Sequence, residues 1–283
     1  MDYWVVVVAR NAAQNISSTL SSLIHQTLPP TRIVVVNDGS SDKTSEILAQ
    51  ASYENPTVRS LTLPERGYDI TRVPSNINLA IESTSDLKTE YLMISGDDCT
   101  YPTEYVEFIL KRLGDSRKIV VASGRPSQSG IAAQEHSPSG SGRIVRASFL
   151  QDVGGTFPSR AGWEAWLLFK AAQMGLETRL FSELTYTHVR PRGTSHQFTY
   201  WGAAMHSLGY HPLYALGRVV RSLIRTTSLN PPMGLLKGYL VAAFGSSDPF
   251  VTPFDPSLRE FVSIQQRREI CRVAFSAFSH GIG

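Results

Sequence analysis

The sequence has little of what marks a secreted, disulfide-bonded or membrane-spanning protein. Its 283 residues include only two cysteines, Cys99 and Cys271, far apart in the chain. This spacing fits neither a cysteine metal site nor a disulfide framework, so we expect a reducing compartment. The opening residues MDYWVVVVARN have no basic stretch, and their apolar run is shorter than that of a secretory signal peptide.

Long apolar runs and a strong charge of one sign are also missing. The longest late apolar run, PPMGLLKGYLVAAFG, contains Lys237 and is shorter than the roughly 20 residues that a membrane-spanning helix needs. We therefore expect no transmembrane helix. The formal net charge is only +3, which gives no general reason to expect nucleic-acid binding.

What the sequence does contain is a regular alternation of apolar strands and amphipathic helices. Apolar runs rich in β-branched residues predict strands near residues 3–10, 32–38, 58–64, 90–98 and 118–124. Apolar residues at helical spacing predict helices near residues 15–26, 44–52, 73–84, 102–114 and 162–175. This order predicts an α/β fold with a mostly parallel sheet flanked by helices.

Two of the predicted strands end in acids. One ends in Asn37-Asp38-Gly39 and the other in Gly96-Asp97-Asp98. If both strands are parallel, their carboxyl ends meet at the sheet edge where ligands usually bind. Carboxylates there suit Mg²⁺ or Mn²⁺ carrying a diphosphate. The alternative, that Asp38 and Asp97 only cap the following helices, is less favoured by the pair than by either acid alone.

Four segments, in this order, resemble family 2 glycosyltransferases of the GT-A fold. They are VVVVARNAAQNISSTLSSLIHQT, IVVVNDGSSDKTSEIL, ISGDDCTYP and GGTFPSRAGWEAWLLFKAAQMG, and the resemblance covers roughly residues 3 to 195. The second segment is close to the family's V-D-D-G-S-x-D-x-T, the third resembles its D-x-D metal motif, and the fourth resembles the helix that carries its catalytic base. The resemblance implies a GT-A, Rossmann-like fold.

For the donor, the resemblance implies a nucleotide sugar lying across the strand ends. Ala9, Arg10 and Asn11 would line the nucleoside pocket after the first strand. Asp38 would accept a hydrogen bond from the base, and Gly39 would let the chain turn sharply behind it. The donor would be a UDP- or GDP-linked sugar.

For the metal, the resemblance implies that Asp97 holds an Mn²⁺ or Mg²⁺ ion that bridges the two phosphates, with Gly96 and Asp98 beside it. The sequence departs from the family pattern in two places. Asn37 and Ser95 stand where the family usually has Asp. The second departure leaves Asp97 as the main metal ligand.

For the base, the resemblance points to Glu164. Direct displacement at a sugar carbon needs a carboxylate to take the acceptor's proton. Counting back from Gly175, the family's aspartate falls on Glu164, and Trp163 replaces the acid before it. The alternative is that Glu164 is only a first-turn acid on an amphipathic helix.

A basic loop is expected over residues 187–197, THVRPRGTSHQ. His188 and Arg192 are candidates for closing over the donor's phosphates, since Arg is well shaped for diphosphate. A solvated basic turn is the alternative. Further candidates are Arg72, facing the site, and Arg143 and Arg146, meeting an acceptor phosphate.

The composition changes near the C-terminus. In HPLYALGRVVRSLIR, Arg218, Arg221 and Arg225 share one helical face and apolar residues the opposite one, and no acid lies between His206 and Leu240. A basic amphipathic helix beside a short apolar segment is typical of an interfacial membrane surface. The alternatives are packing on the catalytic domain or in a homodimer, and the sequence leaves these open.

Together these features predict a catalytic domain over residues 1–200 and a C-terminal helical extension over 201–283. Residues 1–100 would bind the nucleotide sugar and residues 101–200 the acceptor. We expect an inverting, metal-dependent glycosyltransferase on the cytoplasmic face of the membrane, peripherally bound, acting on a polyprenyl-linked or other glycan acceptor. The alternatives are a polyprenyl (dolichyl)-phosphate sugar synthase, which needs no base, and a non-catalytic nucleotide-sugar-binding subunit.

Overall fold

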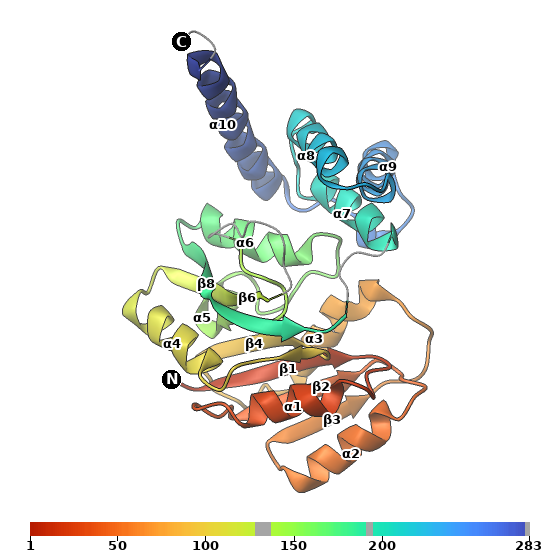
Figure 1. Ribbon diagram of the computed structural model, residues 1–283, viewed down its shortest axis with the longest axis vertical. Coiled ribbons are helices and arrows are strands. Elements are labelled where there is room, and N and C mark those ends of the chain that lie inside the picture. Colours follow the sequence, from red (N-terminus) through yellow and green to blue (C-terminus); the bar gives the residue numbers. More distant parts are fainter. Residues whose placement is uncertain (128–136, 191–194, 281–283) are drawn as a thin grey trace. The chain divides into compact units, whose positions relative to one another are not determined.

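The computed structural model describes residues 1–127, 137–190 and 195–280, and only the backbone of 195–197 and 273–280 (Figure 1). The chain forms two compact units. Unit 1 comprises Met1–Pro158 and Met174–Pro191, and unit 2 comprises Ser159–Gln173 and Arg192–Gly283. The division expected at residue 200 concerns function and stays a prediction.

Unit 1 contains an eight-stranded mixed sheet. Its strands are β1 (Tyr3–Ala9), β2 (Arg32–Asn37), β3 (Val58–Thr62), β4 (Tyr91–Gly96), β5 (Cys99–Thr100), β6 (Ile119–Pro126), β7 (Arg143–Arg146) and β8 (Glu177–His188). Their order is β3-β2-β1-β4-β7-β6-β8-β5. The neighbours β3, β2, β1 and β4 are all parallel, as are β6 and β8. β7 runs antiparallel to β4 and β6, and β5 antiparallel to β8.

Helices cover both faces of the parallel strands. They are α1 (Ile16–Ile24), α2 (Thr44–Glu54), α3 (Val73–Ser83), α4 (Tyr105–Asp115) and α5 (Ala147–Asp152), with the 3-10 turn η1 (Ile70–Arg72) before α3. On one face, α1, α2 and α4 bury Leu20, Leu48 and Leu110 against Val5 and Val7 of β1. On the other, α3 packs on β1 and β2. This burial on both faces explains the continuous apolar runs of the strands.

The predicted α/β class is confirmed. The five predicted strands are observed as β1 to β4 and β6, and the five predicted helices as α1 to α4 and α6 (Trp163–Gln173). The loop expected over residues 187–197 is wrong at both ends. Thr187 and His188 pair with Thr100 and Cys99 and so complete β8, and Ser195 begins a helix.

Unit 2 is helical. Its elements are α6 (Trp163–Gln173), α7 (Ser195–Ser207), α8 (Pro212–Arg225), α9 (Asn230–Phe244), the 3-10 turn η2 (Pro249–Val251) and α10 (Pro256–His280). α7 and α9 pack at close range because Gly202 and Gly238 have no side chain. A Cβ at Gly202 would collide with the carbonyl of Leu235, and one at Gly238 with the carbonyl of Thr199. Among the described residues, no helix is both long and apolar enough to cross a membrane.

Candidate functional site

The two acidic strand ends lie on either side of the end of β1. In the parallel register Ala9 is opposite Asn37 of β2, and Val8 is opposite Gly96 of β4. Asp38 and Asp97 therefore follow neighbouring strand ends on one edge of the sheet, as the parallel order predicted. Both acids are buried.

Arg10 links the two acidic ends. Its backbone N–H donates to Asp97 Oδ2 at 3.1 Å, and its guanidinium donates to the carbonyl oxygens of Asp38 and Gly39. The guanidinium also donates to Glu65 Oε1 at 2.6 Å, and this bond holds the pKa of Glu65 below its usual range. Arg10 thus ties together the loops after β1, β2 and β4.

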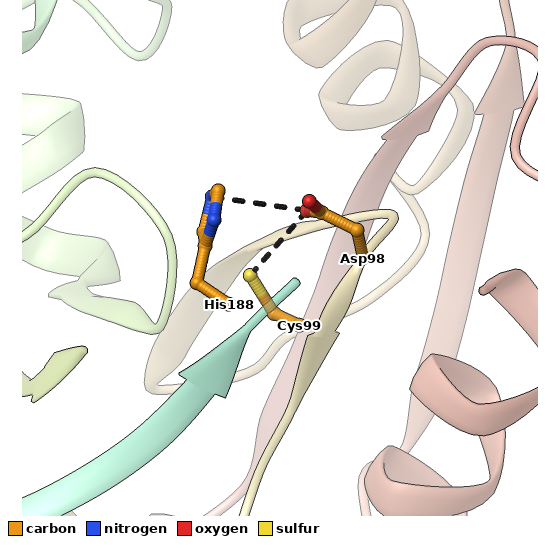
Figure 2. A group of neighbouring side chains, drawn as sticks. All are labelled: Asp98, Cys99 and His188. Carbon is orange, nitrogen blue, oxygen red and sulfur yellow. Dashed lines mark hydrogen bonds and ion pairs between the residues drawn. The ribbon is translucent and has the colours of Figure 1, made fainter. Parts of the chain in front are cut away.

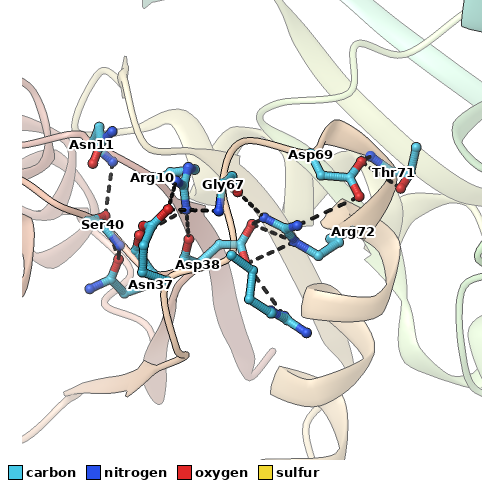
Figure 3. Close-up of polar contacts among 12 residues, drawn as sticks. Arg10, Asn11, Asn37, Asp38, Ser40, Gly67, Asp69, Thr71 and Arg72 are labelled. Atoms are coloured by element: carbon cyan, nitrogen blue, oxygen red, sulfur yellow. Dashed lines mark hydrogen bonds and ion pairs between the residues drawn. The ribbon is translucent and has the colours of Figure 1, made fainter.

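The carboxylate of Asp38 is paired with Arg72, at the start of α3 (Figure 3). Arg72 Nε lies 3.2 Å and 3.1 Å from the two carboxylate oxygens, and its Nη2 lies 3.0 Å from Oδ2. Arg66 Nη2 approaches Asp38 Oδ1 to 3.8 Å. Because a carboxylate has about four acceptor sites, Asp38 keeps capacity for a further donor beside this pair.

The loop after β2 is shaped by amides and hydroxyls. Asn37 is fully buried; its Oδ1 accepts from the Ser40 N–H at 3.1 Å and its Nδ2 donates to Ser45 Oγ at 2.8 Å. Asn11, at a φ of 47°, donates its N–H to Ser40 Oγ at 2.9 Å (Figure 3). Its side-chain oxygen accepts from the Ser41 N–H, also at 2.9 Å. The amide of Asn37 therefore serves to fix the loop, since it supplies one acceptor and one donor where a carboxylate could only accept.

Asp97 and Asp98 form a buried acidic pair that faces Arg190. The Arg190 guanidinium forms ion pairs with Asp97 Oδ1 and, at 3.1 Å, with Asp98 Oδ2. The Arg190 backbone N–H also donates to Asp98 Oδ2, at 2.9 Å. Partial burial lowers the pKa of Arg190 from its usual value, but an arginine remains charged at neutral pH.

A group of side chains with the atoms to hold a cation lies beside this pair. One ligand atom each of Asp98, Cys99 and His188 lies within 4.8 Å of the others (Figure 2). His188 Nδ1 lies 2.9 Å from the Arg190 carbonyl oxygen, which can only accept, so Nδ1 carries the proton. The Nε2 lone pair of a neutral ring then lies 3.7 Å from Asp98 Oδ1, and a cation between these two atoms would satisfy both.

The chemistry of these groups fits a divalent cation held by oxygen and imidazole ligands. Carboxylates from Asp97 and Asp98 with the His188 imidazole suit Mn²⁺. Burial and the neighbouring Asp98 raise the pKa of Cys99 to about 12, so without a cation it is a neutral thiol. Its thiol lies 3.8 Å from Asp98 Oδ1 and donates to that oxygen.

The other predicted residues fall in several places. Glu164 is exposed in the first turn of α6 and belongs to unit 2. Arg192 lies outside the described residues. The acceptor role expected of Arg143 and Arg146 is not favoured by the structure, because their guanidinium groups donate to backbone carbonyls of unit 1.

Sequence reasoning did not select Arg190 and gave Arg72 no partner. Arg190 sits in the basic loop from which His188 and Arg192 were chosen, so the cluster of cations was the available signal. Its contact with the acids depends on the pairing of β5 with β8, which brings His188 opposite Cys99. That pairing has no mark in the local sequence.

Comparisons with known proteins agree with this geometry. The model of a family described as Glycosyl transferase family 2 matches residues 4–173. The chain is 30% identical over 111 residues to the uncharacterized glycosyltransferase YibD of Escherichia coli (strain K12). That match covers 39% of this chain and spans only 30% of the relative's length.

Solved structures share the fold at low identity. S. aureus TarS 1-349 in complex with UDP-GlcNAc has a TM-score of 0.56 and 17% identity, over 88% of this chain and 75% of that one. The mannosyltransferase PcManGT from Pyrobaculum calidifontis, in complex with GDP-Man and Mn²⁺, has a TM-score of 0.59 and 16% identity, over 88% and 76%. At such identities the likeness shows the fold, which is that of GT-A glycosyltransferases.

Proposed function

Because the chain belongs to glycosyl transferase family 2, we propose that it transfers a sugar from a nucleoside-diphosphate sugar to a glycan acceptor with inversion. The observation that supports this proposal most directly is that Asp38 and the pair Asp97–Asp98 flank the end of β1. Arg10 is hydrogen-bonded to both Asp38 and Asp97. The donor would be linked to UDP or GDP, the nucleotides carried by the two similar structures.

At the nucleoside end, Asp38 and Arg72 would read the edge of the base. The Asp38 carboxylate accepts an N–H of uracil or guanine, and the Arg72 guanidinium, held beside it, offers donors to a ring carbonyl. Ala9, Arg10 and Asn11 would form the floor after β1. Arg10 contributes by fixing the backbone of Asp38 and Gly39.

At the diphosphate end, Asp97 would be the main ligand of a divalent cation, with Asp98 and His188 next to it. When bound, the cation neutralises negative charge that develops on the departing nucleoside diphosphate. Arg190 now neutralises the same two acids. Its guanidinium would also contact the phosphates of the donor, because Arg binds phosphate oxygens in a bidentate manner.

We assign the general base to Glu164. In an inverting transfer the acceptor hydroxyl gives its proton to the base while its oxygen forms a bond to the anomeric carbon. The bond from that carbon to the leaving phosphate oxygen breaks with its electron pair. The first turn of a helix stabilises a carboxylate in its charged form, as a base requires, and Glu164 occupies that position in α6.

The acceptor would be a polyprenyl-linked or other membrane-bound glycan, reached from the cytoplasmic face. This part of the proposal depends on the exposed apolar residues of α8 and α9 and on the arginines of α8. A polyprenyl-phosphate sugar synthase remains the alternative with an acceptor that is already ionised, and a non-catalytic binding subunit is the alternative without turnover.

The substitution Glu164→Gln tests the assignment of the base. We expect turnover of the active UDP- or GDP-sugar, measured as nucleoside diphosphate released in the presence of membrane lipid extract, to fall by a factor of about 10²–10⁴ with donor binding unchanged. The matched control is Glu46→Gln, another exposed first-turn acid, in α2. We expect the control to keep full turnover.

Each alternative predicts a different result. Undiminished turnover in Glu164→Gln would contradict the base and favour the synthase of a lipid-phosphate sugar. Donor binding without turnover in the wild-type protein, with lipid supplied, would favour the non-catalytic subunit.

A further inference from the structure

Helix α8 exposes a stripe of large apolar side chains, here named the α8 stripe. Its members are Leu213, Leu216, Val220, Leu223 and Ile224, with 62%, 51%, 46%, 51% and 80% of their surface exposed. Their spacing of three and four residues places them along one side of the helix, within about 100° of its circumference. A folded protein normally buries such a stripe.

The α8 stripe is not the side of the helix that packs inside unit 2. That side carries the buried Ala215 and the half-buried Val219, which pack with Met205 of α7 and Leu235 of α9. Arg218, Arg221 and Arg225 are exposed on a third side. The helix therefore has one side that packs inside unit 2, one exposed apolar side that no described residue covers, and one exposed basic side.

Helix α9, which lies beside α7 and α8 in Figure 1, repeats the pattern. Its exposed apolar residues Met233, Leu236, Leu240 and Phe244 follow helical spacing, and Phe244 has 88% of its surface exposed. Leu235 and Ala242 occupy the buried side. More than half of the exposed large hydrophobic residues among the described ones lie between Leu213 and Phe244.

The charges of this region favour an anionic partner. No Asp or Glu occurs in the sequence between Glu183 and Asp248, whereas α8 carries three arginines and α9 carries Lys237. A surface that is both apolar and basic fits the boundary of an anionic lipid bilayer, where acyl chains lie beside phosphate groups. Neither α8 nor α9 carries an acid, so the same two helices of a second copy would offer the arginines no carboxylate.

We propose that α8, together with α9, binds the surface of an anionic membrane. α8 has 14 residues, or about 21 Å of helix, and a bilayer core is about 30 Å thick, so it would lie in the plane of the membrane. The α8 stripe enters the boundary of the acyl chains. Arg218, Arg221 and Arg225 contact the lipid phosphates. This inference stands on unit 2 alone and does not depend on the sugar donor.

Sedimentation of the full chain with vesicles tests the proposal. We expect binding to vesicles of phosphatidylcholine with 30% phosphatidylglycerol and little binding to phosphatidylcholine alone, as each arginine near anionic lipid contributes about fivefold. The triple variant Arg218→Gln, Arg221→Gln, Arg225→Gln should bind the anionic vesicles about a hundredfold more weakly. Leu223→Ser with Ile224→Ser should weaken binding at least tenfold.

Two matched controls separate position from composition. Lys111→Gln, Arg117→Gln, Lys118→Gln removes the same charge from exposed sites in unit 1, and Tyr53→Ser removes an exposed aromatic side chain of α2. Both should bind vesicles like the wild type. Circular dichroism confirms that each variant is folded.

The proposal is overturned if the wild type does not bind anionic vesicles. It is also overturned if the control substitutions weaken vesicle binding as much as the α8 substitutions do. A dimeric mass without lipid that becomes monomeric in Leu223→Ser, Ile224→Ser, with no vesicle binding, would instead show that a second copy covers the stripe. If the wild type binds anionic vesicles but transfers no sugar, the proposed function is contradicted and the membrane proposal stands.

Discussion

At the scale of single residues, the ion pair between Asp38 and Arg72 determines how the nucleoside end of the site is held. Asp38 is 5% exposed, and a buried carboxylate is costly without a partner. Arg72 supplies that partner through two nitrogens. The pair fixes the direction of the carboxylate, which is what recognition of a base edge requires.

The substitution Arg72→Gln should weaken binding of the preferred nucleoside diphosphate by about tenfold to a hundredfold, because Asp38 loses a charge-assisted bond of about 1.5–3 kcal/mol and its fixed orientation. Titration calorimetry measures the change. The control is Arg66→Gln, since Arg66 is more exposed and lies 3.8 Å from the same carboxylate. An equal loss in both variants would point to general charge rather than to the Asp38 pair.

Residues of the site differ in how far the sequence predicts them. Asp38 and Asp97 stand at the ends of apolar strands, so the parallel order alone brings them together. Arg190 comes from a part of the chain whose path depends on β8, so no local pattern links it to the acids. The role of Asn37 as an amide that fixes the loop is visible only from its partners Ser40 and Ser45.

At the scale of elements, Gly39 controls the turn that follows β2. Its φ is +63°, and a Cβ there would lie 2.5 Å from the carbonyl oxygen of Pro64 and 2.6 Å from the Cα of Glu65. Glycine is therefore required by conformation and by space. Because this turn positions Asp38, a change in its backbone conformation changes the position of the Asp38 carboxylate.

The substitution Gly39→Ala should lower the free energy of unfolding by about 1–3 kcal/mol and weaken nucleotide binding together with it. The matched control is Gly175→Ala, at a φ of +71° with open space around the added methyl group. It shares the backbone strain and lacks the collision. Denaturant unfolding followed by circular dichroism gives both values, and equal losses would show that the collision with Pro64 does not matter.

The strands that the sequence predicts most clearly are those buried on both faces. β1, β2 and β4 are covered on both faces and so read as continuous apolar runs. β8 alternates buried and partly exposed residues and carries polar side chains such as Glu183, and β7 has only four residues. Their place in the sheet depends on long-range pairing with β4, β5 and β6, which local patterns do not contain.

At the scale of the whole molecule, the acidic strand ends and the exposed apolar helices belong to different units. Unit 1 holds the acidic strand ends with Arg10, Arg72 and Arg190 around them, and unit 2 holds α6 with Glu164 and the exposed apolar helices. The sequence predicted the basic amphipathic helix from its periodicity. That its apolar side is exposed could be seen only in the structure, because periodicity does not tell which side packs inward.

The proposed function depends most on whether the acids at the end of β1 bind a nucleoside diphosphate through a divalent cation. Calorimetric titration of UDP and GDP into the wild type, Asp97→Ala and the control Asp115→Ala, each with Mn²⁺ and with EDTA, tests this directly. One diphosphate should bind at least about tenfold more tightly with Mn²⁺ to the wild type and the control, and Asp97→Ala should abolish that gain. Absence of binding under every condition, or a gain from Mn²⁺ that survives in Asp97→Ala, would contradict it.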